Sequence, residues 1–98
     1  MGEDGHFASI FPEMITEKNS INPEGFPEIL TTKPLGCPKY SRITMNLPLI
    51  LQSKSIFLLV HGEKKINTLK LAQSNLTLPV SSLLSAAREK LIIDKINT

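Results

Sequence analysis

An aspartate and a histidine flank a glycine near the start of the chain, in Asp4-Gly5-His6. Glycine lets the backbone turn sharply, so we expect the carboxylate and the imidazole to lie close together at the entrance of a helix. Histidine titrates near neutral pH and is the usual general base, and a nearby carboxylate fixes its tautomer or raises its basicity. The three residues therefore indicate a group that takes a proton. The alternative is that Asp4 caps a helix and His6 is merely exposed.

The composition narrows the classes of function. The 98 residues carry a net charge of only +2, with the basic side chains scattered, which does not favour a nucleic-acid partner. The single cysteine, Cys37, forms no internal disulfide, which favours an intracellular protein. The sequence shows no secretory leader, no apolar run that could cross a membrane and no Cys/His cluster for zinc. We therefore expect a cytoplasmic protein that binds neither nucleic acid nor membrane and holds no metal.

Residues 1–40 and residues 41–98 differ in amino-acid composition. Most prolines and glycines lie within residues 1–40, which predicts a loop-rich region that carries the active site. Within it we expect a short helical turn over 6–11, stopped by Pro12, and a short strand over 28–32. Residues 41–98 show regular apolar patterns and predict an α/β segment.

Strand and helix patterns alternate in this second part. The apolar run over 55–60 predicts a strand buried on both faces, and Pro48 and Pro79 suit first helical turns. The predicted strands here are 42–46, 55–60 and 91–93, and the predicted helices begin near 47, 63 and 79. This alternation of strands and helices indicates an α/β fold with a mainly parallel sheet. Few helices are left to cover that sheet, so we expect residues 1–98 to be a single partial domain of a larger fold.

The residues around His6 are similar to a known signature. Residues 2–12 read Gly-Glu-Asp-Gly-His-Phe-Ala-Ser-Ile-Phe-Pro, which resembles the 6-phosphogluconolactonase motif Gly-x-Gly-x-Asp-Gly-His-Thr-Ala-Ser-Leu-Phe-Pro. Phe7 replaces its threonine and Ile10 its leucine, and the first glycine of the motif would precede Met1. Residues 42–48, Arg-Ile-Thr-Met-Asn-Leu-Pro, resemble the family's Arg-Ile/Val-Thr-Leu-Thr-Leu-Pro. Gly-Glu at 62–63 and Leu-Pro-Val at 78–80 follow in the family's order. The chain thus resembles the C-terminal part of this family, whose fold is Rossmann-like.

The resemblance implies chemical roles for the residues around Gly5. His6 corresponds to the family's proposed general base, which deprotonates a water that attacks the lactone carbonyl. Asp4 positions this histidine or the substrate, and Gly5 lies against the substrate. The resemblance implies no cofactor and no metal.

The resemblance also implies a phosphate site. Arg42 corresponds to the arginine of the family motif, and a guanidinium can take a phosphate in two parallel hydrogen bonds. The family typically has a lysine five positions before this arginine, where this chain has Cys37. We expect Lys39 to take its place, the alternative being that Lys39 is an ordinary solvated loop lysine.

Three interpretations of function follow. The first is hydrolysis of 6-phospho-D-glucono-1,5-lactone, a sugar-phosphate lactone, in the pentose phosphate pathway, with the N-terminal half of the enzyme missing. The second is the related glucosamine-6-phosphate deaminase, whose Asn-Glu after the shared Asp-Gly-His is absent from residues 7–12. The third is a non-catalytic remnant that docks onto a separate N-terminal half, because incomplete sheet edges favour such pairing.

Overall fold

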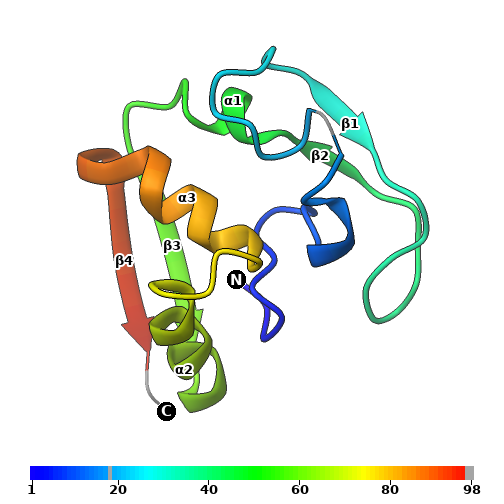
Figure 1. Ribbon diagram of the computed structural model, residues 1–98. Coiled ribbons are helices and arrows are strands. Elements are labelled where there is room, and N and C mark those ends of the chain that lie inside the picture. Colours follow the sequence, from blue (N-terminus) through cyan, green and yellow to red (C-terminus); the bar gives the residue numbers. More distant parts are fainter. Residues whose placement is uncertain (18, 97–98) are drawn as a thin grey trace.

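The computed structural model of this chain describes residues 1–17 and 19–96 (Figure 1). The described residues form two small β-sheets and several short helices. β1 (Ile29–Thr31) pairs with β2 (Ile43–Met45) antiparallel, and β3 (Ile56–His61) pairs with β4 (Leu91–Ile96) parallel. Of the mainly parallel sheet that was expected, the described residues show one parallel pair, β3 and β4, while β1 and β2 form a separate antiparallel pair. Only one loop joins β1 to β2, and a loop connects antiparallel neighbours, whereas parallel strands need a longer crossover.

Two of the three α-helices in the described residues have the predicted prolines in their first turns. α1 (Leu47–Ile50) is capped by Asn46, whose side chain accepts a hydrogen bond from the Leu49 N–H, and α1 has Pro48 in its first turn. α2 (Glu63–Ala72) follows Gly62, which has a φ of 94° and turns the chain out of β3. α3 (Pro79–Ala87) begins at its own proline and continues into the 3₁₀ turn η2 (Arg88–Lys90). The strands and helices expected after residue 41 are all present.

The segment around His6 is not helical, so the helical turn predicted over 6–11 is wrong. Phe7 and Ile10 form an isolated antiparallel bridge, and Ala8 between them has a φ of 50°. Pro12 begins the 3₁₀ turn η1 (Pro12–Met14) instead of ending a helix. Proline suits this place because its fixed φ and missing N–H match a first helical position.

One face of the β3–β4 sheet is covered and the other is not. Leu58 and Val60 are buried in one core with residues of α2 and α3, such as Leu69 and Leu83, and Figure 1 draws both helices on the near side of the strands. The alternate side chain Phe57 is 66% exposed. The prediction that this strand is buried on both faces is therefore wrong for this chain, because α2 and α3 pack on the same side of the sheet.

No helix within the described residues is long and apolar enough to cross a membrane. The cytoplasmic location stays a prediction.

Candidate active site

The Asp4 carboxylate holds the His6 imidazole. Asp4 Oδ1 lies 2.5 Å from His6 Nδ1 and also accepts a hydrogen bond of 3.0 Å from the His6 backbone N–H. Because a carboxylate only accepts, the ring proton sits on Nδ1 and the Nε2 lone pair is left to take a proton. The His6 side chain is 32% exposed and the Asp4 side chain is 45% exposed, so solvent can reach both. The expected proximity of the two groups is therefore observed, at a tight turn and not at the entrance of a helix.

Two glycines allow the turn to close. A Cβ on Gly2 would collide with the His6 ring and would lie 2.9 Å from Asp4 Oδ1. Gly5 has a φ of 83°, a conformation that favours glycine, and a Cβ there would lie 3.0 Å from Leu78 Cβ. Any larger side chain at Gly2 or Gly5 therefore displaces the imidazole or strains the backbone. The sequence pattern did not indicate this role for Gly2.

Helices α2 and α3 each donate a hydrogen bond to the turn that carries Asp4 and His6. The buried Thr68 of α2 donates its hydroxyl to the Glu3 carbonyl at 2.9 Å. The backbone N–H of Val80, in the first turn of α3, donates to the Gly5 carbonyl at 2.9 Å. Asp4 and His6 are therefore held by two helices that lie far away in the sequence. Sequence reasoning missed Thr68, and only the hydroxyl in an otherwise apolar helix face could have indicated it.

The Phe11 ring lies between the functional groups. Its centroid is 4.6 Å from that of the His6 ring, and the guanidinium carbon of Arg42 lies 5.1 Å from the Phe11 centroid. The second distance is typical of a cation–π contact. Because both groups touch the same ring, the distance between His6 and Arg42 cannot exceed the sum of these two values. The structure thus brings the predicted base and the predicted phosphate ligand into one region.

Arg42 organises the loop between β1 and β2. Its Nη2 donates to the Pro38 carbonyl at 2.7 Å, and its Nη1 donates to the carbonyls of Tyr40, at 3.2 Å, and Leu35. These bonds use three of the five N–H donors of a guanidinium, which leaves two for a phosphate. The loop also packs closely here, since a Cβ on Gly36 would lie 2.9 Å from Arg42 Nη1. Arg42 therefore holds the loop in shape, in addition to its predicted role in binding phosphate.

Lys39 lies in the stretch of backbone that Arg42 holds. It is exposed, and its two neighbours, Pro38 and Tyr40, are the residues whose carbonyls accept from the guanidinium. Cys37 is also exposed and is a free thiol. The loop therefore presents an ammonium close in sequence to Arg42, while its role in binding stays a prediction.

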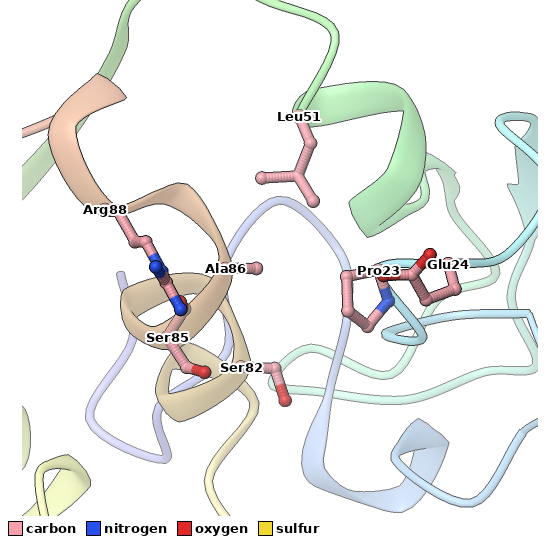
Figure 2. Close-up of a pocket in the computed structure, with 7 residues that line it drawn as sticks. All are labelled: Pro23, Glu24, Leu51, Ser82, Ser85, Ala86 and Arg88. Atoms are coloured by element: carbon pink, nitrogen blue, oxygen red, sulfur yellow. The ribbon is translucent and has the colours of Figure 1, made fainter.

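One cavity lies away from the predicted site residues. A cavity of about 450 Å³ opens between the end of α3 and the loop at Pro23 and Glu24, lined on the helix side by Ser82, Ser85 and Arg88 (Figure 2). None of the residues that line it belongs to the predicted site. The Asp4–His6 pair is instead partly exposed. Within the described residues, no group of three or more His, Cys, Asp or Glu side chains could hold a metal ion.

Comparison with known proteins identifies what the chain resembles. The sequence profile of the family described as glucosamine-6-phosphate isomerases/6-phosphogluconolactonase matches residues 1–93. The probable 6-phosphogluconolactonase 1 of Arabidopsis thaliana is 36% identical over 88 residues, which cover 90% of this chain and 31% of that protein. The 6-phosphogluconolactonase of Helicobacter pylori strain 26695 is 32% identical over 91 residues, covering 90% of this chain and 38% of that protein.

A third relative, the 6-phosphogluconolactonase of Neisseria meningitidis serogroup A, is 35% identical over 65 residues, or 66% of this chain and 28% of that protein. This chain therefore spans 28–38% of the length of these curated relatives. No solved structure matches the chain significantly.

Proposed function

Because this chain belongs to the family of glucosamine-6-phosphate isomerases and 6-phosphogluconolactonases, we propose that it carries the general base of a site that hydrolyses 6-phospho-D-glucono-1,5-lactone to 6-phosphogluconate. The observation that supports this most is the 2.5 Å contact between Asp4 Oδ1 and His6 Nδ1, which leaves Nε2 as an accessible base. The three relatives compared above are named 6-phosphogluconolactonases. The reaction belongs to the pentose phosphate pathway.

The proposed reaction needs one base and no cofactor. His6 Nε2 takes a proton from a water molecule while the water oxygen attacks the lactone carbonyl carbon, which gives a tetrahedral oxyanion. When the oxyanion collapses, the bond between this carbon and the ring oxygen breaks. The leaving ring oxygen takes the proton back from the His6 imidazolium, and the product is a ring-opened acid. Asp4 stabilises the imidazolium that forms between these two steps.

The phosphate of the substrate is assigned to Arg42 and Lys39. Two N–H donors of Arg42 remain after its three loop bonds, and charge-assisted bonds to phosphate are strong. Lys39 adds an exposed cation on the same loop. Gly5, held by Val80, is assigned to the substrate side of the turn. A sugar phosphate bound in this way has its lactone near His6 and its phosphate near Arg42.

Deamination of glucosamine 6-phosphate is less well supported. That reaction needs a further acid for ring opening, and residues 7–12 of this chain contain no acidic side chain. A non-catalytic remnant is the remaining alternative, and only activity distinguishes it from the proposed function.

The test is hydrolysis of 6-phosphogluconolactone, followed by proton release, in two proteins. The first is the 98-residue chain, and the second, the completed protein, is this chain joined at Met1 to the part of the Helicobacter pylori relative that precedes the matched residues. We expect activity in the completed protein that falls by about two to four orders of magnitude in His6→Ala. Lys54→Ala, at an exposed position in the loop before β3, is the control and keeps full activity. Full activity in His6→Ala removes His6 as the base, while deamination in place of hydrolysis moves the chain to the isomerase branch of the family.

A further inference from the structure

The Phe11 ring is buried among parts of the chain that are far apart in the sequence. Only 4% of this residue is exposed. The centroid of the His6 ring lies 4.6 Å from the Phe11 centroid, and the guanidinium carbon of Arg42, directly before β2, lies 5.1 Å from it. Gly36 closes another side, because a Cβ there would lie 2.9 Å from Phe11 Cε1 and Cζ. The ring therefore contacts the proposed base, the proposed phosphate ligand and the loop between β1 and β2.

The backbone fixes the point from which this ring projects. Phe11 precedes Pro12, and a residue before proline is restricted to extended conformations, which the φ of −93° and ψ of 162° fit. The Phe11 carbonyl accepts from the Met14 N–H at 2.9 Å, and the Phe11 N–H donates to Met14 Sδ at 3.4 Å. Met14 is itself buried. The ring is therefore attached to backbone that is held by hydrogen bonds on both sides.

The hydrogen bond to Asp4 does not by itself fix the plane of the His6 imidazole. This bond joins Nδ1 to Asp4 Oδ1, and the imidazole can still tilt about the line between these two atoms. Nε2 does not lie on that line, so a tilt changes where its lone pair points. The Phe11 ring packs against the imidazole with 38° between the planes, at a centroid separation that aromatic pairs favour. This second contact sets the tilt.

The same ring orients the Arg42 guanidinium without using its hydrogen-bond donors. A cation–π contact acts between the positive charge and the face of the ring, so it needs no N–H group. The three loop bonds of Arg42 together with this contact still leave two N–H donors for a phosphate. Phe11 therefore limits where these two donors can point and takes none of them.

We propose that Phe11 is a positioning residue of the lactonase site. Its ring sets the tilt of the His6 imidazole and the place of the Arg42 guanidinium, and it thereby fixes where the base lies relative to the phosphate ligand. This inference rests on the proposed function, in which one substrate spans both groups. A misplacement of about 1 Å between reacting groups can lower a rate about 100-fold, so a fixed relative position matters for turnover.

Phe11→Leu in the completed protein tests the proposal by kinetics. Leucine keeps an apolar side chain in the buried position but has no ring to contact either group. We expect kcat to fall about tenfold to a hundredfold, because Nε2 is no longer aimed. We also expect KM to rise about threefold or more, because the guanidinium loses its cation–π contact.

Ile50→Ala, at a buried position of α1, is the control for a purely structural effect. It lowers the melting temperature by leaving a cavity in the core, and it keeps KM unchanged. A folded Phe11→Leu enzyme with unchanged kcat and KM overturns the proposal. A Phe11→Leu enzyme that differs from the unsubstituted enzyme only as Ile50→Ala does also overturns it.

The motion of the His6 ring gives a readout that does not depend on activity. NMR relaxation of its carbon–hydrogen bonds is measured in the 98-residue chain and in the Phe11→Leu variant of that chain. We expect order parameters near the value of about 0.85 that rigid backbone gives in the unsubstituted chain, and below about 0.6 in the variant. A His6 ring that is equally ordered in both overturns the proposal.

A His6 ring that is already mobile in the unsubstituted chain overturns the proposal as well, and this result needs no folded variant. The two proposals fail in different ways. A completed protein that folds but does not hydrolyse the lactone contradicts the proposed function. If Phe11→Leu nevertheless releases an ordered His6 ring, the positioning of His6 by Phe11 stands.

Discussion

The guanidinium carbon of Arg42 lies 5.1 Å from the centre of the Phe11 ring. The same ring contacts the His6 imidazole on the neighbouring turn. One aromatic side chain therefore links the proposed base to the proposed phosphate ligand, and it does so without a hydrogen bond to either.

Replacing Arg42 separates its two roles. In the completed protein, Arg42→Ala should raise the KM for the lactone about tenfold or more, because charge-assisted bonds to the phosphate are lost. Exchange of the amides in residues 35–40 should also become faster, because the Pro38 and Tyr40 carbonyls lose their donor. Arg88→Ala, beside the cavity of Figure 2, is the control. A faster-exchanging loop with an unchanged KM means that Arg42 only shapes the loop.

Lys39 is tested against a lysine of the same region. We expect Lys39→Ala to raise KM about three- to tenfold with little change in kcat, because an exposed ammonium contributes less than a bidentate guanidinium. Lys33→Ala is the matched control, since both lysines are exposed. Equal effects of the two substitutions indicate a general influence of charge, and in that case Lys39 is an ordinary loop lysine.

Replacing Asp4 tests how the histidine is held. Asp4→Asn keeps the shape of the side chain but removes the charge that stabilises the imidazolium and fixes the proton on Nδ1. We expect kcat of the completed protein to fall by about two to four orders of magnitude. Glu3→Gln provides the control, because the contact recorded for Glu3 uses its backbone carbonyl. An Asp4→Asn enzyme with normal kcat shows that Asp4 is only a turn residue.

Asn46 is predicted to matter for stability and not for chemistry. It is fully buried, its Oδ1 accepts from the N–H groups of Glu28 and Leu49, and its Nδ2 donates to the carbonyls of Asn19 and Phe26. Asn46→Ala leaves these groups without a partner and should cost about 2–4 kcal/mol of unfolding free energy. Urea unfolding measures this loss, and Asn67→Ala on the exposed side of α2 should stay within about 0.5 kcal/mol. A similar small value for Asn46→Ala contradicts the network.

The Met1 amine predicts a pH dependence of stability. Burial and the charge of Lys65 lower the pKa of this amine in the folded chain below the usual 8.0. At a pH between the folded-state pKa and 8.0, the unfolded chain therefore binds more protons than the folded chain. The unfolding free energy should therefore rise as the pH increases towards 8 and fall as the amine is protonated. Acetylation of the amine should flatten this slope, because all other titrating groups stay the same. Urea unfolding of both forms at several pH values checks it, and identical slopes contradict the prediction.

The regular elements were predictable because their signals are local. Pro48 and Pro79 mark first helical turns, and the apolar run of β3 needs no partner to be recognised. The closeness of Asp4 and His6 was also predictable, since Gly5 separates them by a single residue. The roles of these side chains in binding and catalysis stay predictions.

Other features depend on residues that are far apart in the sequence. The pattern of β3 indicated two buried faces, but Phe57 is exposed, because burial is set by elements packed from elsewhere. The contact of Thr68 with Glu3 joins two sites that no sequence pattern connects. The bridge between Phe7 and Ile10 replaces the expected helical turn, since a positive φ at Ala8 could not be deduced from an alanine.

The anchoring of the Asp4–His6 turn has a consequence for biosynthesis. Thr68 reaches back across 65 residues to Glu3, and Val80 reaches further, to Gly5. A ribosome delivers the turn first and its two anchors last. The nascent turn therefore has neither anchor until α2 has left the exit tunnel. A premature stop before Thr68 yields a polypeptide that contains His6 but neither anchor of its turn, and a stop between Thr68 and Val80 leaves only the first.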